Sequence, residues 1–226
     1  MRVEMLAPRF NLAAIEASLR SVQRDFHLIN AVLKTPRDPI GEDVLRNMLA
    51  GYAYVDRLIA ERINIFAMGF LKHLLEMNAL VLCGSEDRPQ YASHLEATER
   101  WFYEDGSGGI RDLVDWMHSH PLRSPWRMAA GAYIRILSEP QLFIEGNHRT
   151  GALVMSYLLA REGLPPFVLS VKNAAGYFDP STTIRHLRKK SLAMLVHLPE
   201  LDARFTEFLQ AQANAAYLIP ASPVAQ

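Results

Sequence analysis

The chain has 226 residues, half of them hydrophobic, and its 24 basic and 24 acidic residues leave no formal net charge at pH 7. This length suffices for a full hydrophobic core, and the balanced charge argues against a broad nucleic-acid-binding surface. A single cysteine, Cys83, excludes an internal disulfide bond and favours a reducing compartment. Residues 1–9 are too short for a secretory signal, and polar residues interrupt the most apolar stretch, residues 63–83. We therefore expect a cytoplasmic protein that binds neither nucleic acid nor membrane.

The first part of the chain is predicted to be helical. Asn11 is placed to cap a helix that reaches about residue 33, because apolar residues recur there at spacings of three and four. Two prolines break the pattern in residues 34–39. A second helical region covers residues 41–82, which is longer than a typical globular helix. It forms either one long spine or two helices that separate near Gly69.

The middle of the chain alternates loops and helices. Residues 83–89 have loop composition, and a polar helix is predicted over residues 90–103. The glycines of residues 104–109 indicate the most flexible segment. A short helix follows over residues 110–119.

The last part of the chain is also predicted to be mainly helical. Residues 167–171 have strand-like composition, and residues 172–180 form a polar loop. Two helices are expected over residues 182–198 and 200–216, and residues 215–226 resemble a frayed tail. The predicted fold class is therefore mainly α, with room for one small β-hairpin.

Residues 141–151 form a turn between two apolar helical patterns, which cover residues 126–137 and 152–163. Pro140 ends the first helix, because proline has no N–H and clashes with the preceding turn. The centre of this stretch has the composition of a turn, with a carboxylate and an arginine on either side of Gly146-Asn147. We therefore expect the functional residues here.

The turn carries the groups that a nucleotide-phosphate site needs. Gly146 and Asn147 precede an apolar run, so they predict a helix start whose N–H groups face outward and attract anions. Glu145 offers a carboxylate for a divalent metal, and Arg149 offers a guanidinium that can clamp a phosphate. A bland alternative is an ordinary helix start with Arg149 in a surface salt bridge.

The turn resembles the Fic family motif, His-Pro-Phe-x-Asp/Glu-Gly-Asn-Gly/Lys-Arg-x-x-Arg. Five residues fall on the pattern, and the likeness extends over roughly residues 112–166: Phe143, Glu145, Gly146, Asn147 and Arg149. The resemblance implies a Fic-like helical bundle with the active-site loop between two core helices. Family members move AMP, or less often another phosphate-linked group, from a nucleotide onto a protein hydroxyl.

The resemblance also implies ligands and an organisation of the chain. Gly146, Asn147, His148 and Arg149 would hold ATP or another nucleotide, Glu145 would hold Mg²⁺, and the partner would be a protein target. Three parts are expected within one compact unit: an N-terminal helical region, a Fic-like core, and a C-terminal helix with its tail. They cover residues 1–89, 90–200 and 201–226.

The turn departs from the family pattern at four positions. Gln141 stands at the catalytic His, Leu142 at the Pro, His148 at the small or basic position and Ala152 at the second Arg. A carboxamide can orient a hydroxyl but cannot deprotonate it near neutral pH. Gln141 is thus the candidate at the catalytic position, and the binding residues match better than the catalytic ones.

Three functions stay open at this stage. The chain is a divergent Fic transferase, or a catalytically inactive Fic-fold binding or regulatory module, or a helical partner-binding protein whose match is accidental. His148 projects away from Gln141 and is not expected to replace the missing base. The basic residues of 185–190 predict a solvated helix face. The other histidines are predicted to have structural or surface positions: His27, His73, His94, His118, His120, His186 and His197.

Overall fold

A computed structural model describes residues 7–84, 89–103 and 109–220. Within these residues the fold is mainly α, as the sequence predicts. Five helices lie in the first half: α1 (Leu12–Arg24), α2 (Phe26–Val32), α3 (Glu42–Ala60), α4 (Lys72–Cys83) and α5 (Pro89–Tyr103). Five more follow: α6 (Ile110–Ser119), α7 (Pro125–Leu137), α8 (Asn147–Ala160), α9 (Ala174–Ile184) and α10 (Leu192–Ala211). The 3₁₀-helix η1 (Ala215–Tyr217) and the strands β1 (Arg9–Phe10) and β2 (Leu218–Ile219) complete the described chain.

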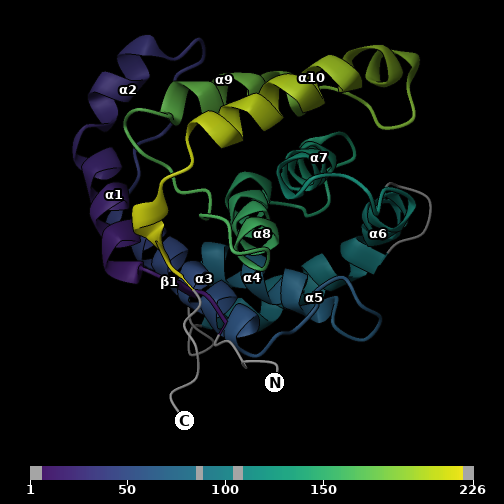
Figure 1. Cartoon of the computed structure of the whole chain (residues 1–226), viewed down its shortest axis with the longest axis horizontal. Helices are drawn as coiled ribbons and strands as arrows, with labels where there is room; N and C mark the ends of the chain where they lie inside the picture. Colours follow the sequence, from purple (N-terminus) through teal and green to yellow (C-terminus); the bar gives the residue numbers. More distant parts are fainter. Residues whose placement is uncertain (1–6, 85–88, 104–108, 221–226) are drawn as a thin grey trace, which may run out of the picture.

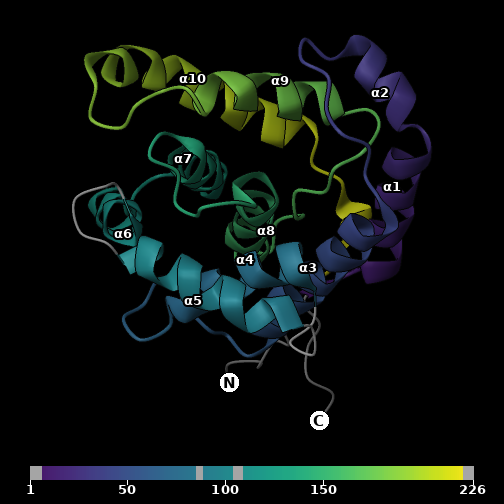
Figure 2. The ribbon, with the colours of Figure 1, turned by 180° about the vertical axis from the view of Figure 1, so that it is seen from behind.

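Helix α8 occupies the centre of the molecule. Figures 1 and 2 show it between a layer formed by α3, α4 and α5 and a layer formed by α9 and α10, with α7 alongside. Twelve of its 14 residues are buried. A helix that is apolar all round belongs in a core, and its first residue is Asn147 of the predicted turn. The predicted site is therefore carried by the most enclosed helix of the fold.

Small residues allow the neighbours of α8 to approach closely. A Cβ atom on Gly151 would lie 2.7 Å from the Tyr133 ring of α7, and one on Gly51 of α3 would lie 2.5 Å from Leu153 Cδ1. Because real side chains do not tolerate such separations, both glycines are needed where they stand. The turn before α8 is thus held between tightly packed helices.

The N-terminal helices differ from the prediction in where they break. The Asn11 side chain caps α1 by accepting a hydrogen bond from the Ala14 N–H at 3.2 Å, as expected. The first helix does not continue to residue 33, however, because it is interrupted at Asp25. The long second region forms two helices, and residues 61–71 separate them, with Gly69 in the left-handed region at φ 85°. The two-helix alternative is therefore confirmed.

The C-terminal prediction is wrong in several places. Residues 172–180 are not a loop, because α9 begins at Ala174 and continues through Pro180. The expected helix boundary near residue 199 is absent, because α10 continues through Pro199. Residues 215–219 are not a frayed tail, since they contain η1 and β2. Both helices thus contain a proline in their interior, where proline is normally disfavoured.

The strand-like segment 167–171 contains no strand. It runs beside the core, and the Phe167 carbonyl accepts hydrogen bonds from the Tyr52 hydroxyl at 2.8 Å and the Ser156 hydroxyl at 2.7 Å. Side chains of α3 and α8 therefore satisfy this backbone, and no partner strand does.

The β-structure is a two-stranded antiparallel sheet that joins the two ends of the described chain. Arg9 pairs with Ile219, and Phe10 pairs with Leu218. The Phe10 N–H also donates to the buried Asp56 carboxylate at 2.6 Å, and the Arg9 guanidinium forms an ion pair with the same group. These contacts fasten the sheet to α3. The strands come from distant segments and do not form a hairpin.

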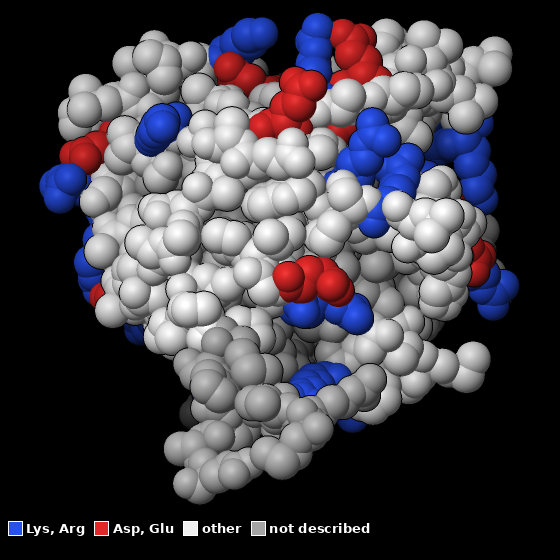
Figure 3. Space-filling view, in the orientation of Figure 1, with Lys and Arg blue, Asp and Glu red and all other residues white. Residues whose placement is uncertain are grey.

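The glycine-rich segment predicted to be flexible lies mostly outside the described residues, as do most of the 83–89 loop and the end of the tail. No helix in the described ranges is long and apolar enough to cross a membrane. On the face in Figure 3, acidic and basic groups are mixed and much of the surface is uncharged. The three-part division of the chain stays a prediction.

Candidate functional site

The turn before α8 requires glycine at position 146. Gly146 has φ 73° and ψ 7°, and its carbonyl accepts a hydrogen bond from the Thr150 N–H at 2.9 Å. A Cβ atom there would lie 2.9 Å from Asn78 Nδ2 and 3.0 Å from Leu82 Cγ. Glycine adopts this left-handed backbone without a steric penalty. The helix therefore starts where the sequence predicts.

Asn147 closes the turn on itself. Its side chain is buried, and Oδ1 accepts a hydrogen bond from the Phe143 N–H at 2.9 Å. Its Nδ2 donates to the Phe143 carbonyl at 2.7 Å and to Gln141 Oε1 at 3.1 Å. Phe143 itself is buried and stacks on Phe102 of α5. The Asn147 side chain thus holds the loop in shape, and only its backbone N–H faces a ligand position.

Gln141, at the predicted catalytic position, is also held within the loop. Its Nε2 donates to the Leu137 carbonyl at 3.3 Å, while its Oε1 accepts from Asn147. Its backbone carbonyl accepts a hydrogen bond from the Trp101 indole at 3.1 Å. Both ends of the carboxamide are therefore paired inside the protein. This geometry fits a residue that joins the end of α7 to the start of α8.

Asn78 of α4 forms hydrogen bonds with the loop and with α8. The sequence analysis does not predict these contacts. Its Nδ2 donates to the Glu145 carbonyl at 2.8 Å and to Thr150 Oγ1 at 3.0 Å. Its Oδ1 lies 3.0 Å from His94 Nε2 of α5. Burial lowers the pKa of His94, and the Glu145 charge partly opposes that shift. A buried polar side chain in an apolar helix needs partners, so Asn78 within its apolar run was the available signal.

Glu145, the predicted metal ligand, is exposed. No group of three or more His, Cys, Asp or Glu side chains lies close enough to hold a metal in the described part of the chain. A Mg²⁺ ion prefers phosphate oxygens and water beside one or two carboxylates. The residues present therefore fit Mg²⁺ only together with a phosphate ligand, with Glu145 as the protein's contribution.

Arg149 is half-buried and points along the end of α4. Its Nη1 donates to the Val81 carbonyl at 2.5 Å. Burial lowers the pKa of Arg149, and the charges of Glu145 and Cys83 partly oppose this. Among the described residues no carboxylate forms an ion pair with it. Its positive charge is therefore available to an anion near the start of α8.

His148 is turned inward. Its Nδ1 shares a hydrogen bond with the Tyr133 hydroxyl at 3.2 Å, and its carbonyl accepts one from the Tyr177 hydroxyl at 2.7 Å. Burial lowers the pKa of His148 to about 4, and the positive charges of Arg37 and Arg185 add to this effect. The imidazole is therefore neutral at physiological pH and faces the core. Its backbone N–H remains in the first turn of α8.

The first-turn amides of α8 lie where the sequence predicts an anion site, which stays a prediction. No backbone acceptor is recorded, within the residues that the structure describes, for the N–H groups of Asn147, His148 and Arg149. Such groups at a helix start favour negative charge. On the side of α8 away from Asn78, a cavity of about 490 Å³ is lined by His148, Arg149 and Ala152 together with α1, α3 and α9. The turn thus has a cavity beside it.

Comparison with known proteins finds that part of this chain is similar in sequence to proteins named Fic-1. No family model matches the chain. A stretch of 72 residues is 33% identical to the protein named protein adenylyltransferase fic-1 of Caenorhabditis elegans, and equally to that of Caenorhabditis briggsae. The match covers 30% of this chain and 14% of each relative.

Two solved structures were also found to be similar. One is a Fic domain-containing signalling protein of Bacteroides thetaiotaomicron, with a TM-score of 0.47, 15% identity, and coverage of 88% of this chain and 82% of that one. The other is a fragment of Fic-1 from Caenorhabditis elegans, with a TM-score of 0.46, 18% identity, and coverage of 89% and 61%. Over the 72-residue stretch the chain is related in sequence to protein adenylyltransferases.

Proposed function

We propose that this chain is a Fic-type domain that binds nucleotide phosphates at the start of α8 and lacks transfer activity of its own. The first-turn N–H groups and the Arg149 guanidinium supply donors for phosphate. Glu145 would contribute to Mg²⁺ bound with ATP or another nucleotide. The domain would then act as a binding or regulatory module for a protein target in the cytoplasm.

One observation carries the choice of a module over an enzyme. At the position of the family's catalytic His, Gln141 donates to the end of α7 and accepts from Asn147. A carboxamide has no basicity to offer an attacking hydroxyl, and this one has both ends occupied. General-base help is worth on the order of 10²–10⁴ in rate, so its loss leaves binding without efficient transfer.

Nucleotide titration tests the binding half of the proposal. We expect ATP with Mg²⁺ to bind the purified chain, measured by isothermal titration calorimetry. Arg149→Gln should weaken binding about tenfold, because it removes a charge-assisted contact to phosphate. Arg161→Gln, on the exposed end of the same helix, is the matched control and should leave the affinity unchanged. Absence of binding by ATP, GTP and other nucleotides would overturn the proposal.

A labelling assay tests the catalytic half. The chain is incubated with nucleotides labelled on the α-phosphate and with lysate proteins. We expect no labelled product from the wild type and labelled product from Gln141→His, which restores the basic group. Labelled product from the wild type would instead support a divergent transferase, the alternative favoured by the stretch shared with proteins named adenylyltransferases.

A further inference from the structure

The cavity beside α8 combines an apolar wall with a polar group of residues. Its volume, about 490 Å³, falls within the range of small-molecule sites. The apolar lining comes from α1, α2, the 37–40 segment, α3, α8 and the 167–178 region: Leu19, Phe26, Pro39, Ile40, Val44, Leu45, Met48, Ala152, Phe167, Leu169 and Phe178. The remaining lining residues are Arg37, Asp38, Tyr52, His148, Arg149 and Tyr177.

Both tyrosine hydroxyls of this cavity already donate a hydrogen bond within the protein. The Tyr52 hydroxyl donates to the Phe167 carbonyl at 2.8 Å, and the Tyr177 hydroxyl donates to the His148 carbonyl at 2.7 Å. Both rings therefore present mainly their apolar surfaces to the cavity. A ligand group that needs several hydrogen bonds along its body, such as a nucleobase, would lose those bonds here. The wall fits an aliphatic body.

The positive charges at the cavity are not neutralised within the protein. Arg37 Nη2 donates to Thr182 Oγ1 at 2.7 Å, but its Nε is buried and has no hydrogen-bond partner. Among the described residues neither Arg37 nor Arg149 forms an ion pair with a carboxylate. The one acidic side chain of the lining, Asp38, is exposed. The charges of these two guanidiniums are therefore left for a ligand.

Both guanidiniums belong to residues that line this cavity. Arg37 is near enough to His148 to depress the pKa of that imidazole, and Arg149 follows His148 in the chain. The unpaired first-turn amides add the positive end of the helix dipole. Two positive charges therefore lie in the lining of a cavity that is otherwise mostly apolar.

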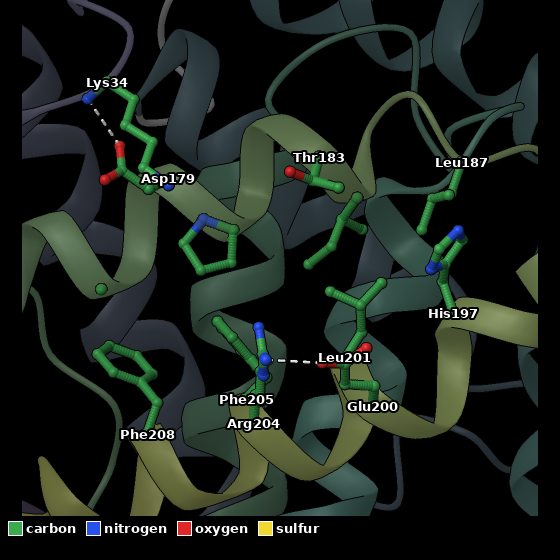
Figure 4. A pocket seen from close by; sticks show the side chains of 13 residues that line it. Lys34, Asp179, Thr183, Leu187, His197, Glu200, Leu201, Arg204, Phe205 and Phe208 are labelled. Carbon is green, nitrogen blue, oxygen red and sulfur yellow. Dashed lines mark hydrogen bonds and ion pairs between the residues drawn. The ribbon is translucent and has the colours of Figure 1, made fainter.

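The cavity between α9 and α10 differs from this one, because its arginine is paired with a carboxylate. It measures about 430 Å³. Figure 4 shows Arg204 beside Glu200, an ion pair of 2.6 Å, and Asp179 accepting the Lys34 N–H at 3.0 Å. The arginine of this cavity is thus paired with a carboxylate, which is not the case for the two arginines of the cavity beside α8.

We propose that the cavity beside α8 binds an amphipathic anion, a linear aliphatic chain with a carboxylate or phosphate head. The aliphatic chain lies against the apolar wall formed by α3, α8 and the 167–178 region. The head group is held by the positive charges of Arg37 and Arg149 in the lining. The apolar wall of this site is not part of the proposed nucleotide site, although Arg149 contributes to both sites. Binding of the amphipathic anion does not depend on transfer activity.

Calorimetric titration of four ten-carbon probes below their micelle concentrations tests the head group. Decanoate and decyl phosphate carry the two anionic heads, decanol is neutral, and decyltrimethylammonium is positive. We expect both anions to bind at least about tenfold more tightly than decanol, and the cation not to bind. The stronger of the two anions identifies the head group. Equal affinities for decanoate and decanol, or no binding by either anion, would overturn the proposal.

Variants locate the binding in the cavity. Arg37→Gln retains a donor for Thr182 but loses the charge, so decanoate should bind about tenfold more weakly while decanol is unchanged. Ala152→Met fills part of the cavity and should weaken both probes. Arg204→Gln in the other cavity is the matched control and should change neither. Unaltered decanoate affinity in both Arg37→Gln and Ala152→Met would refute the site.

A fold check and an ATP titration keep the outcomes distinct. Circular dichroism and thermal unfolding verify that each variant is folded, and the wild-type probe series stands even where Arg37→Gln is unstable. ATP titration of Arg37→Gln should match the wild type, because Arg37 is not among the residues proposed to hold the nucleotide. Loss of decanoate binding with ATP binding retained is therefore the expected result for this variant. Loss of both in a folded variant contradicts two separate sites.

Discussion

The motif loop, residues 141–147, and the cavity beside α8 both lie near the start of that helix. They differ in how their polar groups are paired. In the loop, Asn147 and Gln141 pair with the backbone and with each other. In the cavity, Arg37 keeps a buried Nε–H without a partner, and Arg149 reaches a carbonyl but no carboxylate. Buried polar groups are normally satisfied, so the paired side chains of the loop indicate a structural role, whereas the guanidiniums of the cavity keep a charge that no carboxylate among the described residues pairs.

This comparison changes how the motif is interpreted. Asn147 and Gln141 look like functional residues in the sequence, because they stand at positions of a known motif. Their contacts show that both side chains shape the loop. The groups that remain for a ligand are backbone amides, the motif residue Arg149, and Arg37, which lies outside the motif. The loop is therefore expected to respond to mutation through stability, and the cavity through binding.

The largest effect is expected from Asn147→Ala. The change leaves the buried N–H and carbonyl of Phe143 without partners, so the free energy of unfolding should fall by about 4 kcal/mol. Urea denaturation followed by circular dichroism measures it. Asn214→Ala is the control, since Asn214 is exposed and caps η1 with one hydrogen bond, and it should cost at most about 1 kcal/mol. Equal losses would remove the distinction between the loop and a surface cap.

The second effect concerns acid. The pKa of His148 is lowered to about 4 in the folded protein from an ordinary value of 6.5. Between these values the unfolded state binds a proton that the folded state refuses, so stability falls as the pH falls from 6.5 towards 4. The shift corresponds to about 3 kcal/mol across that window. Above pH 6.5 both states are neutral and the effect vanishes.

Urea denaturation at a series of pH values measures this slope. His148→Gln should flatten it, because the glutamine does not titrate. The exposed His27→Gln serves as the control and should leave the slope as in the wild type. A slope unchanged by His148→Gln would show that other groups, such as His73 and His94, account for the acid sensitivity.

The third effect comes from Gly146→Ala, which should lower the free energy of unfolding by about 2 kcal/mol. Two causes contribute: a left-handed backbone, and a Cβ atom 2.9 Å from Asn78 Nδ2. Gly163→Ala separates them, because Gly163 has the same φ of 73° and nothing within 4 Å of its Cβ position. It should cost about 1 kcal/mol, from backbone strain alone. Equal costs would mean that the Asn78 contact yields without penalty.

Local signals in the sequence were sufficient for much of the fold. Residues 110–119 were predicted as a helix with the bounds of α6, and the start of α8 was placed at Gly146 and Asn147. Asn11 was identified as a cap from its position before an apolar repeat. Each of these depends on residues a few positions apart, so the pattern contains the cause.

Distant contacts were beyond such signals. Helix α9 was missed because Pro180 and its polar neighbours have loop composition, while packing of Tyr177 and Ile184 against the core decides the outcome. The Asn78 bond to the Glu145 carbonyl joins residues 67 positions apart. The partner of Arg149 is a backbone carbonyl of α4, which has no sequence signature. The cavity could not be predicted from the sequence for the same reason, because its lining residues come from segments between α1 and α9.

The smallest effect is the one that decides what Gln141 does. Gln141→Met removes the bond to the Leu137 carbonyl and leaves Asn147 Nδ2 with one partner fewer, so stability should fall by about 1 kcal/mol. A residue kept for catalysis often costs stability, and replacing it leaves the protein as stable or more so. Denaturation of Gln141→Met beside Gln141→His therefore separates the two interpretations. A loss in both variants supports a loop residue, whereas a gain in both would return Gln141 to the active site.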